Sequence, residues 1–229
     1  MHDDRHRGRA VDADGAEDHL GAQFLASVED LRAALAADPS LATARPDGAR
    51  TLLHSLVDWP GHRDRAVELL ALLVEAGADV NARFGGPEHD ETPLHWAASN
   101  DDVLMVDALL DAGADIDARG GVIGGGTPLD DAWAFGQWRA ARRLVERGAT
   151  PSFLAACALG LPLGEGDATQ GLWAAAHGGS RENAELLLAR GADPQWVGWD
   201  DLTPEAAARR SGFTELADFL REPTKTDHA

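Results

Sequence analysis

Residues 92–98 read TPLHWAA, and a second phrase, GADIDAR, follows at residues 113–119. His95 in the first phrase and Gly113 in the second lie eighteen residues apart. The phrases recur along the chain: TPLD at 127–130 with GA at 148–149, LWAA at 172–175 with GAD at 191–193, and, at a longer interval, TLLH at 51–54 with GADVNAR at 77–83. Repetition of this kind indicates a solenoid of stacked supersecondary units.

Each copy carries the local signals of a pair of helices. Pro93 and Pro128 follow threonines, and proline suits the first position of a helix because its φ angle is already helical. Apolar residues in the second half of each copy follow a helical period. Gly113 and the equivalent glycines at 77, 148 and 191 come after the last apolar residue, which predicts left-handed positions that end the second helices. Because one such pair cannot bury its own apolar face, the copies are expected to stack.

These phrases resemble the ankyrin repeat family, whose repeats read roughly G-x-T-P-L-H-x-A-A, then an apolar helix, then L-L-x-x-G-A-D-x-N-A. The resemblance covers about 200 of the 229 residues and includes Gly125 before the second Thr-Pro. It implies an all-α solenoid of helix-turn-helix units with β-turn fingers, and repeats of this type mostly bind proteins. A solenoid fold does not by itself identify the ligand.

The copies also set the expected domain organisation. We expect a disordered segment at 1–18, one repeat array over 19–222 and a flexible tail at 223–229. Apolar residues at helical spacing predict a helical cap at the start of the array, ending near Asp38 and Pro39: Phe24, Leu25, Val28, Leu31 and Leu35. Proline and glycine interrupt residues 161–167, so the repeat at 151–169 is predicted to be truncated, without a normal second helix.

Composition excludes several classes of protein. The formal net charge is −19, which disfavours binding to nucleic acid because phosphate backbones are recognised by clustered Lys and Arg. No apolar run is long enough for a membrane span, and the charged N-terminus is not a signal peptide. A single cysteine, Cys157, fits a reducing cytoplasm and is expected to be a buried, inert thiol. The chain contains a single lysine and no tyrosine, and this bias in composition resembles the one that codon usage produces in a GC-rich bacterium.

The candidate binding residues lie mainly where the first helices end, because these positions face the concave groove in ankyrin-like folds. Tryptophan is frequent among residues that dominate binding, although packing between repeats is an equal alternative for Trp59 and Phe135. Core packing is favoured for Trp138 and Trp173, and solvent exposure is expected for Trp196 and Trp199 on a finger. The candidate binding set is Trp59, Trp96, Ser99, Asn100, Trp133, Phe135, His177, Trp196 and Trp199.

Histidines and aspartates offer a second kind of site. His54 and His95 match the motif histidine of the family, which usually holds the turn through hydrogen bonds. Imidazole beside carboxylate can also perform acid–base chemistry, with the following candidates: Asp58, His95, Asp130, Asp131 and His177. His62 and His89 have no role that the sequence assigns. No spacing matches a zinc signature, so neither a metal nor another cofactor is expected.

Two functions follow from these features. The first is a cytoplasmic protein-interaction module that grips a partner with its concave groove and finger loops; no catalytic motif is visible. The second is a protein that binds a small apolar ligand, or an unusual enzyme, with tryptophan, histidine and aspartate lining a concave pocket. Its motivation is the irregular insertion at 58–63 and the truncated repeat, since a regular scaffold needs neither. The function must be argued from the site and not from the fold.

Overall fold

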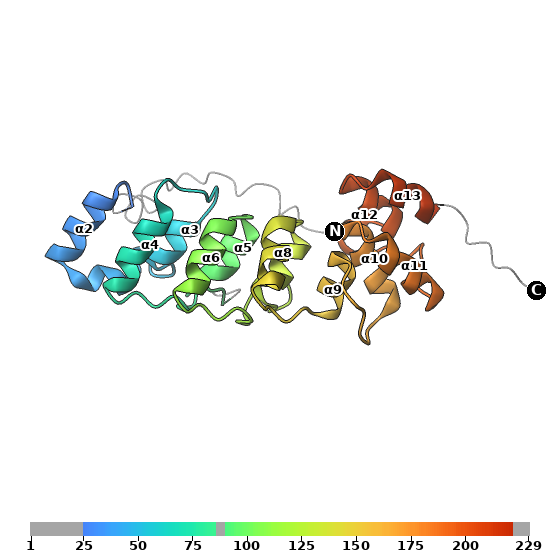
Figure 1. Cartoon of the computed structure of the whole chain (residues 1–229), viewed down its shortest axis with the longest axis horizontal. Helices are drawn as coiled ribbons and strands as arrows, with labels where there is room; N and C mark the ends of the chain where they lie inside the picture. Colours follow the sequence, from blue (N-terminus) through green and yellow to red (C-terminus); the bar gives the residue numbers. More distant parts are fainter. Residues whose placement is uncertain (1–24, 86–89, 222–229) are drawn as a thin grey trace, which may run out of the picture.

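The computed structural model describes residues 25–85 and 90–221, and within these ranges all regular secondary structure is helical. The chain progresses along the long axis of the molecule from α2 at one end to α10–α13 at the other (Figure 1). Their bounds are α2 Val28–Ala37, η1 Pro39–Thr43, α3 Leu52–Val57, α4 Ala66–Glu75, α5 Pro93–Ser99, α6 Val103–Asp111, α7 Pro128–Ala134, α8 Trp138–Glu146, α9 Phe153–Leu159, α10 Ala168–Gly178, α11 Arg181–Ala189, η2 Trp199–Asp201, α12 Pro204–Arg210 and α13 Thr214–Arg221. The predicted segments 1–18 and 223–229, together with Phe24 and His89, lie outside the described residues.

The helices pack in two rows, as the repeats predict. The first helices contact one another in the order α3, α5, α7, α9, α10 and α12, and the second helices α4, α6 and α8 form a parallel row. Their apolar faces build one continuous core that runs from Leu25 to Leu220. This arrangement confirms the all-helical stacked fold expected from the phrases.

Threonine caps α3, α5 and α7, and in each of them the side chain three residues later completes the cap. The Thr92 N–H donates to His95 Nδ1 at 3.1 Å, and His95 Nε2 lies 3.3 Å from the carbonyl oxygen of Gly126 in the next repeat. His54 makes the equivalent contact with the carbonyl oxygen of Glu91 at 3.2 Å. The turn-holding role expected for the two motif histidines is therefore confirmed.

Asp130 takes over this role in the following repeat. Its Oδ2 accepts hydrogen bonds from the Thr127 N–H at 3.0 Å and from Thr127 Oγ1 at 3.1 Å. Its Oδ1 accepts from Ser152 Oγ at 2.6 Å, which joins this repeat to the next. A carboxylate can accept all of these bonds at once, so histidine is replaceable here without loss of the cap.

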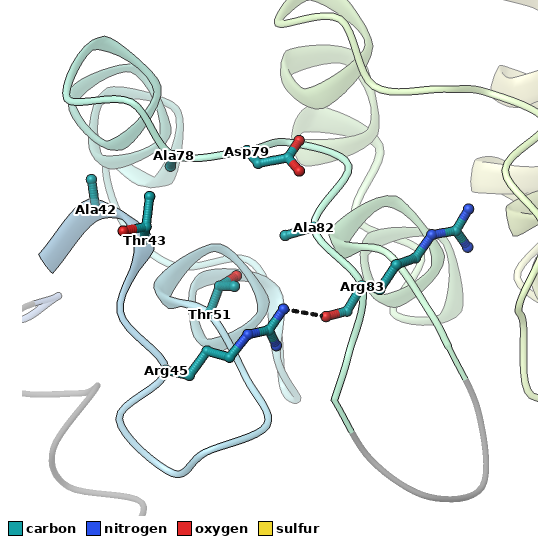
Figure 2. A pocket seen from close by; sticks show the side chains of 8 residues that line it. All are labelled: Ala42, Thr43, Arg45, Thr51, Ala78, Asp79, Ala82 and Arg83. Carbon is teal, nitrogen blue, oxygen red and sulfur yellow. Dashed lines mark hydrogen bonds between the residues drawn. The ribbon is translucent and has the colours of Figure 1, made fainter. Parts of the chain in front are cut away.

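Arginines join successive fingers. Arg45 Nη2 donates to the carbonyl oxygen of Arg83 at 2.6 Å, and Arg83 Nη1 donates to the carbonyl oxygens of Asp90, at 3.0 Å, and of Arg119. Figure 2 shows the first of these bonds beside a cavity of about 250 Å³ between η1 and the finger that follows α4. The dipeptide Ala-Arg that ends each of these fingers thus fixes the spacing between neighbouring repeats.

The repeat at 151–169 lacks a second helix, as predicted. After α9 the chain runs through residues 160–167 without a helix and enters α10. Asn183 of α11 covers the gap, because its Nδ2 donates to the carbonyl oxygens of Ala156, at 3.1 Å, and Leu161, at 3.0 Å. A single amide thereby satisfies backbone groups that a second helix would otherwise cover.

Gly113 is one of the glycines predicted to adopt a left-handed conformation at the end of a second helix. Its φ angle is 96°, as predicted, and a Cβ built on it has no neighbour within 4 Å. Gly113→Val should therefore lower the free energy of unfolding through backbone strain alone, by on the order of 1–3 kcal/mol. Denaturant unfolding measures this loss. Gly164→Val is the matched control, because Gly164 is equally open but has no positive φ angle; an equal loss in both variants would contradict the assignment.

Candidate functional site

A pocket of about 240 Å³ opens where the first helices of three consecutive repeats end. Its lining residues are Asp58, Trp59, Glu91, Trp96, Ser99, Asn100, Val122 and Phe135. The structure thus brings together Trp59, Trp96, Ser99, Asn100 and Phe135 from the predicted binding set, and adds the candidate Asp58. Sequence reasoning missed Glu91 and Val122, which lie in finger loops whose lengths differ between the copies.

The aromatic side chains of this pocket differ in exposure and in the contacts that hold them. Trp59 is 77% exposed and Phe135 is 41% exposed, whereas Trp96 is half-buried. Trp96 Nε1 donates to Glu91 Oε2 at 3.0 Å, and its ring packs edge-on against His54 at 5.2 Å between centroids. Trp96 is therefore held in place, while Trp59 and Phe135 present open apolar surface.

Polar contacts fix the floor and one rim of the pocket. Asn100 Nδ2 donates to the carbonyl oxygen of Val57 at 2.7 Å, which ties α5 to the end of α3. Arg50 lies between two carboxylates, with Nη1 2.7 Å from Asp58 Oδ2 and Nε 2.5 Å from Asp47 Oδ2. Ser99 Oγ is buried and has no hydrogen-bond partner among the described residues. The pocket lining therefore contains the Asp58 carboxylate, which pairs with Arg50, and a Ser99 hydroxyl that can still form a bond.

His177 lies in a different place from the one predicted. It was expected at an open surface position, but its side chain is only 6% exposed. Its ring lies 5.2 Å from both the Trp138 and the Trp173 rings, and Nδ1 is 2.9 Å from Ser211 Oγ. Gly178 explains the difference: a Cβ there would lie 2.0 Å from the Ala158 carbonyl oxygen, so α10 approaches α9 closely and encloses the histidine.

The other tryptophans divide between core and surface. Trp133 is buried, so its prediction as a groove residue is wrong; its Nε1 lies 3.4 Å from Asp130 Oδ1. Core packing is confirmed for Trp173, whose Nε1 donates to the Leu202 carbonyl oxygen at 2.9 Å. Trp199 is exposed as expected, but Trp196 is half-buried. The Trp199 ring packs edge-on against Trp173 at 5.0 Å and Trp196 at 5.6 Å.

The candidate acid–base groups do not meet around one pocket. His95 is fully buried in its cap, where burial lowers its pKa to about 4. Asp130 caps α7, and Asp58 pairs with Arg50. His177 belongs to the separate aromatic cluster, where burial again lowers its pKa. The arrangement of His95 and His177 with Asp130 or Asp131 around one concave pocket is therefore wrong.

His62 and Cys157 are held within the structure and do not line the pocket. His62 anchors the loop between α3 and α4, because its N–H donates to Asp102 Oδ2 at 2.8 Å. Cys157 is fully buried, as expected, and burial raises its pKa to about 11. Among the described residues, no group of three or more His, Cys, Asp or Glu side chains is placed to hold a metal ion. No helix in the described part of the chain is long and apolar enough to cross a membrane.

The burial of His177 reverses the stability effect expected for a surface histidine. His177→Ala removes an enclosed ring and leaves Ser211 Oγ without its partner, so we expect a loss of roughly 2–4 kcal/mol in the free energy of unfolding. Thermal or denaturant unfolding measures it. Leu104→Ala, at a position that is 73% exposed on α6, should change stability by less than about 0.5 kcal/mol. An equally small loss of unfolding free energy in both variants would contradict the burial of His177.

Asp131 makes stability depend on pH. It is fully buried beneath the loop at 120–126, where Oδ1 accepts from the Ile123 N–H at 3.0 Å. Burial raises its pKa from 3.8 to about 7, and the charges of Glu91 and Asp130 add to this rise. The folded state therefore binds the proton more tightly than the unfolded state, and the stability contributed by this proton is lost as pH rises from about 4 to about 7.

Asp131→Asn should remove this dependence. From pH 5 to pH 8 the free energy of unfolding of the variant should gain roughly 2–3 kcal/mol relative to the wild type, because the amide has no charged form. Urea unfolding of both proteins at four or five pH values measures the difference. His54 and His95 titrate in both proteins and cancel from the comparison. A difference that does not change with pH would show that Asp131 has an ordinary pKa.

Comparison with known proteins places part of this site in a repeat of known type. The ankyrin repeat family matches residues 89–121, which include Glu91, Trp96, Ser99 and Asn100 of the pocket. Short segments are similar to palmitoyltransferases: 58% identity over 43 residues to palmitoyltransferase AKR1 of Kluyveromyces lactis (19% of this chain, 6% of that protein), 36% over 72 residues to palmitoyltransferase ZDHHC17 of Danio rerio (31% and 11%), and 31% over 102 residues to palmitoyltransferase ZDHHC17 of Homo sapiens (42% and 15%).

The chain spans only 6% to 15% of the length of these relatives. The similarity therefore concerns the repeats and not the whole of those proteins. Together with the stacked helical pairs, the matches support an ankyrin repeat family for this chain.

Proposed function

We propose that this chain is a protein-interaction module that grips a partner through the pocket formed by Trp59, Trp96 and Phe135. The ankyrin repeat match supports a module of this kind. The observation that carries the proposal is the exposure of Trp59, which is 77%, in a pocket that the rings of Trp96 and Phe135 also line. Large aromatic side chains in such pockets dominate many protein interfaces.

Packing does not account for these side chains. The continuous core includes Leu52, Leu94 and Leu129 of the same three helices, and it is complete without Trp59 or Phe135. Trp96, by contrast, is held by Glu91 and His54 before any partner arrives. A rigid ring between two open ones lowers the entropy lost on binding, because fewer side chains must be ordered.

Catalysis receives no comparable support. His95 forms hydrogen bonds within its cap, and His177 is enclosed between two tryptophans. General acid–base chemistry needs an imidazole within reach of the proton that moves, and neither ring lines the pocket. We therefore favour binding over the enzyme alternative. We also propose a cytoplasmic location, since a single buried thiol suits a reducing compartment.

Substitutions at the open rings test the proposal. Trp59→Ala and Phe135→Ala should each weaken partner binding by about 2 kcal/mol, or roughly thirtyfold in Kd, with the fold intact. Quantitative mass spectrometry of proteins captured by the wild type and by each variant identifies a partner lost from both variants, and calorimetry with that partner gives the Kd. Leu104→Ala, on a different face, should bind normally. Unchanged affinity in both pocket variants, or loss of folding, would contradict the proposal.

A further inference from the structure

We propose that the pocket bounded by Trp59, Trp96 and Phe135 accepts an arginine side chain of the partner. This inference rests on the proposed function and specifies the chemistry of its central contact. It follows from three features of the same pocket: aromatic walls, an excess of carboxylate charge and a hydroxyl without a hydrogen-bond partner.

The aromatic walls come from three successive repeats. Trp59 follows α3, Trp96 lies within α5, and Phe135 follows α7. A cation over the face of an aromatic ring is attracted by the negative charge at the ring face, most strongly for tryptophan. Arginine is especially suited, because its planar guanidinium stacks on such a face and is more weakly hydrated than an ammonium group.

The charge of the rim favours a cation. Asp47 and Asp58 share the single guanidinium of Arg50, so this group retains one net negative charge. Glu91 is a third carboxylate, and its Oε2 accepts the indole N–H of Trp96. Hydrogen bonding to a carboxylate polarises the indole and increases the negative charge on its face. The formal net charge of −19 adds a long-range attraction for a basic segment.

Ser99 supplies a specific hydrogen-bond acceptor. Ser99 is one of the residues that line the pocket. Its Oγ is buried and has no hydrogen-bond partner among the described residues. A buried polar atom without a partner is costly, so a donor from a ligand would remove this cost. Arginine carries five N–H donors in one plane, and they can reach Ser99 while the guanidinium stacks on a ring.

The size of the pocket selects a single side chain. Its volume is about 240 Å³, and an α-helix with its side chains is about 10 Å across. One long side chain therefore enters, and the segment that carries it lies across the ends of α3, α5 and α7. A lysine would gain the charge attraction but lacks the planar stacking, so it should bind more weakly than arginine.

Peptide selection on the full chain tests the inference without knowledge of the natural partner. A displayed library of random peptides is selected on the wild type and counter-selected on the double variant Trp59→Ala, Phe135→Ala. We expect the pocket-dependent peptides to share an arginine. Replacing that arginine by citrulline, its neutral isostere, should weaken binding to the wild-type protein at least tenfold, and replacement by lysine should weaken it less. Added salt should reduce the affinity of the arginine peptide more than that of the citrulline peptide.

Protein variants provide a second measurement. Asp58→Asn should weaken the arginine peptide and leave the citrulline peptide nearly unchanged, whereas Asp111→Asn, at an exposed carboxylate on α6, should affect neither. Leu186→Ala is the matched control for Phe135→Ala, since their side chains are 46% and 41% exposed, and it should bind normally. Thermal unfolding of each variant checks the fold.

The outcomes separate the two proposals. Pocket-dependent peptides without a cationic residue, or an arginine peptide that binds as well with citrulline, would overturn the arginine inference and leave the interaction module intact. Absence of any pocket-dependent peptide would overturn both. A shared arginine with a tenfold loss on citrulline replacement supports both.

Discussion

The structure depends on one contact: the side chain three residues after Thr51, Thr92 and Thr127 reaches into the next repeat. His54 and His95 contact carbonyl oxygens of the following finger, and Asp130 accepts a bond from Ser152. Each group therefore caps its own helix and also fixes the position of its neighbour. Because no repeat can bury its apolar face alone, this spacing determines which side chains meet in the core and which meet at the pocket.

The sequence predicts this scaffold well because its determinants are local. Thr-Pro starts a helix and Gly113 ends one, whatever the neighbouring repeat contains. The pocket was predictable only in part: aligned positions identified Trp59 and Phe135, but Glu91 and Val122 come from fingers of unequal length. His177 was misplaced because the close approach of α10 to α9 depends on Gly178, and an alignment of phrases carries no distance between helices.

The pocket and the packed aromatic cluster lie in different parts of the array. The open pocket lies over α3, α5 and α7, where each repeat has both helices, and it includes Asp58 and Trp59 of the insertion at 58–63. The region after the truncated repeat instead encloses its histidine and tryptophans in a packed cluster. The truncated repeat therefore strengthens contacts between helices, whereas the insertion at 58–63 and the variable ends of the first helices supply the open surface. This division agrees with the general separation of scaffold from site.

The missing second helix also affects how the array unfolds. In a linear array, stability is a sum of repeat terms and nearest-neighbour terms, and a weak neighbour term divides the array into separately cooperative blocks. With no second helix after α9, one of the two rows is interrupted between α8 and α11. The ring of His177 lies between Trp138 of α8 and Trp173 of α10 and spans this interruption. This histidine adds to the contacts that α7, α9 and α10 already make across the interruption, so we expect hydrogen exchange in α10–α13 to follow the same opening event as that in the earlier repeats.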